Sequence, residues 1–206
     1  MRIMGVVCSP RVGGNTEILA NEAMSGAKQE GADTSLLFIR GKDIKPCDGC
    51  FGCRGGQCHI RDDMQGINNM LINMDGILIG SPLYWTIPGQ AATFLDRTLP
   101  LALTGKLANK VGGAIIVAAR YAGETAAALL RRYFMYCHMI PIDWVVGYAS
   151  DKGDVVKDEA AMKASFELGR MMALFIKNGN KLPEEFHGPL MPYVYKKYGA
   201  SRYRKP

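Results

Sequence analysis

Four cysteines lie within a short, glycine-rich segment at a spacing that could hold a metal centre. Cys47, Cys50, Cys53 and Cys58 follow the pattern C-x2-C-x2-C-x4-C, with glycines between them. Iron–sulfur cubanes are held by four cysteine thiolates in runs of similar compactness. Glycine allows the sharp backbone turns that bring such ligands around one compact anion. The segment 45–63, which we call the cysteine loop, is therefore predicted to bind an iron–sulfur cluster through these four cysteines.

Two other uses of the four cysteines stay open. Structural zinc usually joins two C-x2-C pairs across a longer spacer, so cysteines at i, i+3 and i+6 are unusual for it. A disulfide network requires an oxidising compartment. Cys8 and Cys137 lie outside the loop in apolar surroundings, where we expect them to be buried as small hydrophobic residues.

The length and composition of the chain indicate one α/β domain followed by a tail. Its 206 residues are 48% hydrophobic, which is enough for a full core, and its formal net charge is +6. No apolar run approaches the roughly 18 residues of a membrane span, and the opening apolar stretch is too short for a signal peptide. We therefore expect a cytoplasmic protein with reduced thiols and no membrane partner.

Short apolar segments alternate five times with longer helical patterns. The predicted strands are residues 3–7, 35–39, 76–80, 111–118 and 144–148. The predicted helices are residues 16–29, a helix capped by Asp62 or Asp63, and residues 90–97, 125–139 and 158–177, with an irregular stretch around Pro100 and Gly105. Buried strands separated by helices indicate a parallel sheet covered on both faces. Right-handed crossovers then favour an α/β, flavodoxin-like doubly wound sheet of five strands in the order 2-1-3-4-5.

In a sheet of this order, ligands bind beyond the carboxyl ends of the strands, where the order reverses between the first and third strands. The loops that follow these two strands, residues 9–15 and 81–89, are therefore the expected binding loops. The cysteine loop follows the second strand, so we expect it at the same end of the sheet.

The segment SPRVGGNT, residues 9–16, joins the first strand to a helix and has groups that bind phosphate. Ser9, Asn15 and Thr16 offer side-chain donors, and Arg11 offers a forked cation. Gly14 lets backbone N–H groups approach an anion at the positive end of the helix dipole. The segment has neither the G-x-G-x-x-G nor the P-loop pattern, so it suits a terminal phosphate monoester such as that of FMN. The alternative is a well-capped turn.

Aromatic residues follow the third strand in the segment SPLYW. Pro82 stiffens the end of the strand, while Leu83, Tyr84 and Trp85 suit the edge and face of a planar isoalloxazine ring. Core packing is the alternative role for Trp85. Together with the predicted phosphate loop, the segment favours a flavin pocket at this end of the sheet.

The segment ARYAGE, residues 119–124, follows the fourth strand and would close the third side of this pocket. Ala119, Arg120 and Gly123 are the candidate contacts with the ring. A positive charge at Arg120 would stabilise an anionic reduced flavin, whereas a solvated arginine is the alternative.

Together, the segments SPR-x-GGNT and SPLYW and the pattern C-x2-C-x2-C-x4-C resemble the iron–sulfur flavoprotein family, within the NAD(P)H-dependent FMN reductase superfamily. The resemblance covers about residues 1–180, and the cysteines are its most specific part. It implies a flavodoxin-like fold, with one FMN and one [4Fe–4S] cluster per chain. It also implies ferredoxin as the electron donor and a homodimer or a dimer of dimers, the latter a homotetramer.

By position, the resemblance assigns the phosphate to Ser9, Arg11, Asn15 and Thr16, the ring to Pro82, Leu83, Tyr84 and Trp85, and the cluster to Cys47, Cys50, Cys53 and Cys58. The expected function is electron transfer between the cluster and FMN, from ferredoxin to a small acceptor, with no catalytic acid, base or nucleophile. One alternative is an NAD(P)H-dependent FMN or quinone reductase with an accessory cluster. Another is a non-catalytic, zinc-stapled binding protein on the same scaffold.

The expected domain comprises residues 1–180 and includes the cysteine loop, whereas residues 181–206 are expected to form a basic, aromatic tail. The basic residues of its second half are Lys196, Lys197, Arg202, Arg204 and Lys205. Because no nucleic-acid-binding fold accompanies them, we expect no nucleic-acid partner. We expect the tail to pack on a neighbouring subunit or to offer a basic patch to an acidic electron carrier.

Overall fold

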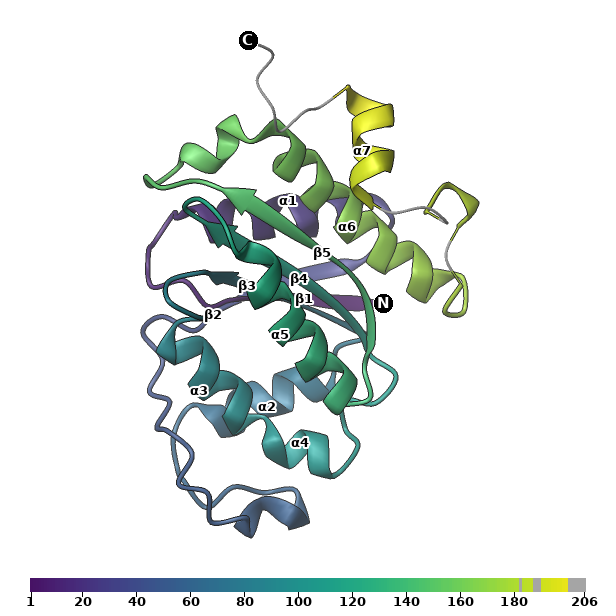
Figure 1. Cartoon of the computed structure of the whole chain (residues 1–206). Coiled ribbons are helices and arrows are strands. Elements are labelled where there is room, and N and C mark those ends of the chain that lie inside the picture. The colour runs from purple at the N-terminus through teal and green to yellow at the C-terminus, as the bar shows by residue number, and fades with distance from the viewer. Residues whose placement is uncertain (182, 187–189, 200–206) are drawn as a thin grey trace.

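A parallel sheet of five strands, covered by helices on both faces, forms the centre of the computed structural model (Figure 1). The structure describes residues 1–181, 183–186 and 190–199. The strands are β1 (Arg2–Val7), β2 (Asp33–Phe38), β3 (Gly76–Pro82), β4 (Val111–Ala118) and β5 (Ile140–Tyr148). Their order in the sheet is β2-β1-β3-β4-β5, and each neighbouring pair is parallel, which confirms the predicted flavodoxin-like topology.

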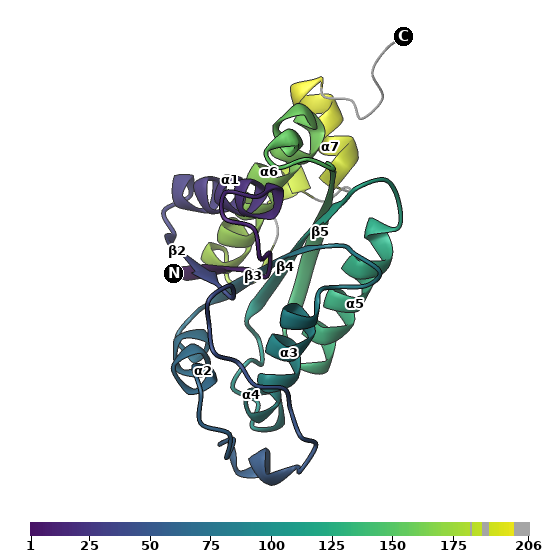
Figure 2. The ribbon, with the colours of Figure 1, turned by 90° about the vertical axis from the view of Figure 1, so that its left-hand side faces the viewer.

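The helices form two layers on opposite faces of the sheet (Figures 1 and 2). One layer holds α1 (Asn15–Gln29) and α6 (Glu159–Lys177), and the other holds α2 (Met64–Ile72), α3 (Gly89–Arg97), α4 (Leu99–Leu103) and α5 (Gly123–Tyr136). The remaining elements are α7 (Leu190–Tyr198) and the 3-10 turns η1 (Gly52–Gly55), η2 (Asp154–Lys157) and η3 (Glu184–Phe186). Within the described ranges, none of the helices combines the length and the apolar character needed to cross a membrane.

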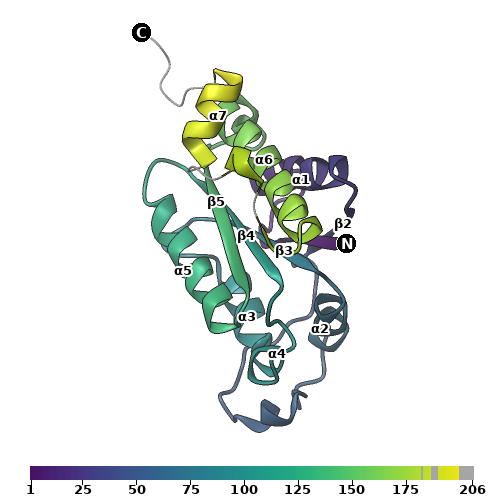
Figure 3. The ribbon, with the colours of Figure 1, turned by 90° about the vertical axis from the view of Figure 1, so that its right-hand side faces the viewer.

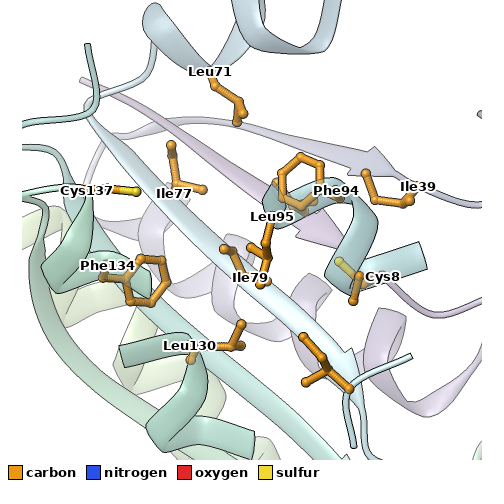
Figure 4. Close-up of a cluster of buried hydrophobic side chains, with 14 of the residues drawn as sticks. Cys8, Ile39, Leu71, Ile77, Ile79, Phe94, Leu95, Leu130, Phe134 and Cys137 are labelled. Carbon is orange, nitrogen blue, oxygen red and sulfur yellow. The ribbon is translucent and has the colours of Figure 1, made fainter. Parts of the chain in front are cut away.

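Alternate residues of β3 pack against the two helix layers, because successive side chains of a strand point to opposite faces. Ile77 and Ile79 belong to the core with Phe94 of α3 and Phe134 of α5, all almost fully buried (Figure 4). Leu78 belongs instead to the core with α1 and α6. These cores anchor the helices next to the loops after β1, β3 and β4.

Helices α1 and α6 approach each other closely because two glycines face the partner backbone. A Cβ atom added to Gly26 would lie 1.9 Å from the carbonyl oxygen of Phe166, and one added to Gly169 would lie 1.7 Å from that of Ala23. No side chain larger than hydrogen fits at either position. The pair of glycines therefore sets the distance between α1 and α6.

Two elements differ from the prediction. Strand β5 begins at Ile140, four positions before the expected start at 144, and it includes Pro141. Because β5 is an edge strand, the missing N–H of Pro141 is tolerated there. The stretch expected to be irregular contains α4, with Pro100 in its first turn, where a proline removes no helical hydrogen bond.

The described part of the tail packs on its own chain, and its expected contact with a neighbouring subunit stays a prediction. Figure 3 shows α7 beside α6. Val194 of α7 is fully buried, and Lys197 pairs with Glu167 of α6 at 2.7 Å. The Tyr198 hydroxyl also bonds to the buried Glu167 carboxylate. The predicted basic residues at 202, 204 and 205 lie outside the described residues.

We predict that Gly169→Ala lowers the free energy of unfolding by about 1–3 kcal/mol, because the added methyl group forces α1 and α6 apart. Gly66→Ala is the matched control, since Gly66 is exposed on α2 with open space around its Cβ position. This control is expected to add about 0.5–1 kcal/mol of stability. Urea unfolding of both variants checks the difference, and equal midpoints would contradict the proposed close approach.

Candidate functional site

The loop after β1 turns tightly into the start of α1 and forms a polar cradle. Ser9 is buried, and its Oγ accepts a hydrogen bond from the backbone N–H of Arg11 at 3.2 Å. Gly14 is the residue that caps α1, and an added Cβ would lie 3.0 Å from the Cβ of Arg11. The first N–H groups of α1 have no partner within the helix and carry the positive end of its dipole. The loop therefore has backbone donors at the place where the sequence predicts an anion site.

The side chain of Asn15, which we expected to donate to phosphate directly, bonds instead to the loop after β5. Its Nδ2 donates to the carbonyl oxygen of Asp151 at 2.7 Å, and its Oδ1 accepts from the N–H groups of Gly153 at 2.8 Å and Val155 at 3.3 Å. Asn15 thus fastens the loop after β5 to the cradle, and it contributes its backbone N–H to the start of α1. Thr16 is buried beside it.

This fastening brings Lys152 to the cradle, a residue that the sequence analysis missed. The Lys152 Nζ lies 3.9 Å from the Cβ position of Gly13, which has a φ of +60°. The Gly13 N–H donates to the Glu17 carboxylate, which pairs with Arg40 at 2.9 Å. Lys152 is remote from the loop in sequence, so only the tertiary contact through Asn15 reveals it.

A cavity of about 390 Å³ lies beyond the ends of β3 and β4 and combines two of the predicted segments. Its lining comprises Leu83, Tyr84, Trp85, Thr86 and Ile87, residues 119–122, and Thr125, Ala126 and Leu129 of α5. The Trp85 side chain is fully exposed and does not pack in the core of the chain. The structure therefore brings Ala119 and Arg120 beside the aromatic segment.

Pro82, Leu83 and Gly123 are also predicted to contact the ring, and each has a role in the packing or hydrogen bonding of the strands and helices. Pro82 ends β3 and is half-buried, and the next residue, Leu83, donates its N–H to the Val117 carbonyl oxygen at 2.7 Å. Gly123 is the first residue of α5, and an added Cβ would lie 2.2 Å from the Val146 side chain. Glycine at position 123 therefore allows α5 to pack on β5. Tyr121, exposed at the cavity, is an aromatic residue that the sequence analysis did not single out.

The cysteine loop lies away from this cavity. It leaves β2 at the carboxyl edge of the sheet, but then runs past the layer of α2, α3 and α4 to its outer side (Figures 1 and 2). Its turn η1 contacts α4, and the Cβ position of Gly56 lies 3.2 Å from the Thr104 side chain. The expectation that the cysteines lie at the flavin end of the sheet is therefore wrong, because residues 40–46 carry the loop along the outside of the helices.

The four loop cysteines are without disulfide bonds within the described residues and lie around tight turns. Gly49, Gly56 and the non-glycine residue Phe51 all have positive φ, at 71°, 91° and 55°. Burial raises the pKa of Cys53, and the charges of the other three loop thiolates raise it further. Ionisation of Cys53 is thus disfavoured next to the other cysteines, and a cationic iron core would offset the charge of four thiolates. The residues present therefore fit an iron–sulfur cluster.

A smaller ligand set overlaps the loop. The ligand atoms of Asp48, Cys50 and His59 lie within 4.8 Å of one another, as a single metal ion would require. Hydrogen bonds to Cys50 and to His59 lower the pKa of the exposed Asp48 to about 2, and His59 Nε2 lies 2.7 Å from its carboxylate. In a cubane each thiolate binds a different iron, so its four cysteines need not converge on one point. Asp48 and His59 thus serve as a tie across the loop.

The base of the cysteine loop contains a buried ion pair that the sequence analysis missed. Arg97 of α3 and Asp62 have side chains 1% and 0% exposed, and their closest atoms are 2.5 Å apart. Burial alone would raise the pKa of Asp62, but Arg97 and the backbone N–H groups of Lys45 and Met64 hold it below its usual range. Nothing in the sequence around Arg97 distinguishes it from an exposed arginine at a helix end.

Comparison with known proteins places the chain in a family. Residues 1–152 match the family described as NADPH-dependent FMN reductase. An iron–sulfur flavoprotein of Methanocaldococcus jannaschii is 32% identical, with 86% of this chain and 98% of that protein covered. An iron–sulfur flavoprotein of Archaeoglobus fulgidus is also 32% identical, with 84% of this chain and 79% of that protein covered.

Solved structures support the fold. The Trp repressor binding protein from Bacillus subtilis is similar with a TM-score of 0.63 at 23% identity, covering 81% of this chain and 99% of that chain. A flavodoxin from the domain Archaea gives a TM-score of 0.59 at 18% identity, covering 86% and 99%. Family membership argues against the alternative of a non-catalytic binding protein. The chain belongs to the iron–sulfur flavoproteins, flavin-dependent oxidoreductases of the NADPH-dependent FMN reductase family.

Proposed function

We propose that this protein transfers electrons between an FMN at the carboxyl ends of β1, β3 and β4 and a [4Fe–4S] cluster on the cysteine loop. The observation that carries the proposal is the presence of two separate, chemically matched sites in one chain. One is the anion cradle beside an aromatic cavity of about 390 Å³, and the other is the set of four thiols. FMN exchanges one or two electrons and the cluster one, so the pair connects a two-electron reactant with a one-electron carrier.

In this proposal the cradle holds the phosphate of FMN and the cavity holds its ring. The donors to the phosphate are Ser9, Arg11, Thr16, the backbone N–H groups of Gly14 and Asn15, and the ammonium group of Lys152. The contacts with the ring are Pro82, Leu83, Tyr84, Trp85, Ala119, Arg120 and Gly123. Exposed aromatic faces beside a cradle of fixed donors support this assignment, because they match the apolar ring and the anionic end of one ligand.

Within one chain, none of the described residues of the cysteine loop lines the cavity that we assign to the ring, although Leu129 of α5 lines both this cavity and a second one at the loop. A second cavity of about 540 Å³ is lined by Cys47 and Gly49 on one side and by Leu129 and Tyr136 of α5 on another. The exposed fractions of Leu129 and Tyr136 are 41% and 63%, high for an apolar and an aromatic side chain. We propose that a second copy of the chain covers this face, in a homodimer or a dimer of dimers, and that the shortest route between cluster and flavin crosses this interface.

The electron donor in this proposal is ferredoxin or a similar acidic carrier, and the final acceptor is a small molecule. Exposed basic side chains surround the cysteine loop at Lys42, Lys45, Arg54 and Arg61, and the chain has a formal net charge of +6. A patch of positive charge steers an acidic partner toward the cluster. This charge distribution supports a protein donor on the side of the molecule that carries the loop.

A second candidate function is NAD(P)H-dependent reduction of FMN or a quinone, with the cluster as an accessory. The match to the NADPH-dependent FMN reductase family favours it. The open cavity with the exposed Trp85 leaves room for a nicotinamide to stack on the ring. Stopped-flow reduction of the flavin by NADPH and by reduced ferredoxin separates the two, because the donor with the faster second-order rate identifies the function.

We predict that Cys50→Ala abolishes binding of iron and acid-labile sulfide but leaves FMN bound, because the two sites lie on different loops. Anaerobically purified protein is analysed for iron, sulfide and flavin, together with its visible spectrum. Cys137→Ala is the control, since Cys137 is buried outside the loop and should change none of these contents. Unaltered protein without acid-labile sulfide would contradict the cluster proposal.

We predict that Lys152→Ala weakens FMN binding by about fivefold, or ~1 kcal/mol for a partly solvated ion pair, and leaves riboflavin binding unchanged. The dissociation constants are measured by quenching of flavin fluorescence at low ionic strength, where surface charges are least screened. Lys157→Ala is the control, because Lys157 is nearby but pairs with Asp154 at 2.6 Å. Equal affinity of the unaltered protein for FMN and riboflavin would instead show that the cradle does not bind the phosphate.

We predict that the protein is a dimer or tetramer in solution and that Leu129→Glu shifts it toward the monomer, because a charge would be buried in the proposed interface. Light scattering across a concentration series measures the mass. Met70→Glu is the control, since Met70 has a similar exposed fraction of 40% but lies on α2. A monomeric unaltered protein would contradict the route between subunits.

A further inference from the structure

A single guanidinium group joins the two ends of the cysteine loop. Arg97 Nη1 donates to the Lys45 carbonyl oxygen at 2.6 Å and to Asp62 Oδ2 at 2.5 Å. Its Nη2 donates to Asp62 Oδ1 at 3.0 Å and to the Ile60 carbonyl oxygen at 3.4 Å. Lys45 lies two residues before the first cysteine of the loop, and Ile60 lies two residues after the last. The loop is therefore closed at its base by one side chain from α3.

Asp62 extends this closure to the next helix. Its Oδ2 also accepts the Lys45 N–H at 2.9 Å, and its Oδ1 accepts the N–H of Met64, the first residue of α2, at 3.0 Å. A second tie lies beside it, because the N–H of Asp43 donates to the Asp63 carboxylate and the N–H of Asp63 to the Asp43 carbonyl oxygen, both at 3.0 Å. The base of the loop is thus held to both α2 and α3 by hydrogen bonds between protein groups.

Closing a loop with a buried ion pair carries a large desolvation cost, because both charges lose their hydration. A well-packed apolar pair of similar volume is often at least as stable. The position of the Arg97 charge offers a reason for the ion pair. The guanidinium of Arg97 bonds to the carbonyl oxygens of Lys45 and Ile60, each of which lies two residues from a cysteine of the loop. The positive charge therefore lies at the base of the loop that carries the four thiols. Charge and hydrogen bonding at cluster sulfurs set the reduction potential of iron–sulfur centres.

We propose that Arg97, oriented by Asp62, is a positioning residue for the iron–sulfur cluster: it forms the cysteine loop before iron binds and places a fixed cation at the base of the loop that would hold the cluster. The inference rests on the proposed cluster site. A cation next to the cluster favours the more negative reduced form, so Arg97 raises the reduction potential and the carboxylate of Asp62 partly offsets it. The other basic residues near the loop, such as Arg54, are exposed, and solvent and salt screen their charges.

The test compares Arg97→Gln, Arg97→Lys and Asp62→Asn with Arg54→Gln, which removes the same charge from an exposed position in the loop. The first measurement is hydrogen exchange of residues 45–63 in iron-free protein. We expect exchange at least about tenfold faster in both Arg97 variants and in Asp62→Asn, because each leaves a buried group without its partner. Arg54→Gln should exchange like the unaltered protein.

The second measurement is the midpoint potential of the cluster, followed by visible and electron paramagnetic resonance spectra during redox titration. We expect Arg97→Gln to lower the potential, Asp62→Asn to raise it and Arg97→Lys to stay nearest to the unaltered value. Arg97→Gln and Asp62→Asn break the same ion pair, so a purely structural role would not shift the potential in opposite directions in these two variants. If Arg97→Gln does not fold, the two other variants carry the test.

The outcomes separate this inference from the proposed function. Protein without sulfide would refute the cluster itself, whereas the exchange data on iron-free protein would still decide whether Arg97 forms the loop. Protein with a cluster whose potential moves in the same direction in Arg97→Gln and Asp62→Asn, or moves no more than in Arg54→Gln, would overturn the electrostatic role. Unchanged exchange in all variants would overturn the positioning role.

Discussion

The reversal of strand order around β1 is the constraint on which the binding cavity depends. Because every crossover between parallel strands is right-handed, the chain must leave β1 toward one face and β3 toward the other. The loops after these strands diverge, while the hydrogen bond from the Cys8 N–H to the Gly80 carbonyl oxygen at 2.8 Å keeps the strand ends together. The crevice between the loops thus follows from the strand order. The anion cradle and the aromatic segment then give it its chemical character.

The cysteine loop is an excursion within the connection from β2 to α2, and its rigidity comes from the hydrophobic core. Its base is tied to the first turn of α2 and the last turn of α3. Met64 of α2 and Phe94 of α3 are almost fully buried in the core beneath the sheet. The cysteine loop, in which Cys47 and Cys50 are exposed, thereby gains a fixed base, because the buried helices cannot move without disrupting the packing of the domain.

The cradle and the cysteine loop differ in how their cations are held. At the cradle, Lys152 lies close to Gly13, and Arg40 is paired with Glu17 at 2.9 Å. The cysteine loop has a buried cation that is nearly neutralised by its own carboxylate. The cation at the cradle is thus the exposed Lys152, whereas the cation at the base of the cysteine loop is the buried Arg97.

The sequence by itself determined the strand order, the loop after β1 and the four cysteines, because apolar runs, turn glycines and ligand spacing are local patterns. Only the tertiary structure decided that the cysteines lie beyond α4, that Asn15 binds the loop after β5, and that Arg97 closes the cysteine loop. It also decided that Pro141 lies within a strand, because only strand order shows that β5 is at an edge. These features join residues remote in the chain, and the free energy that selects them depends on burial and on partners that no local pattern specifies.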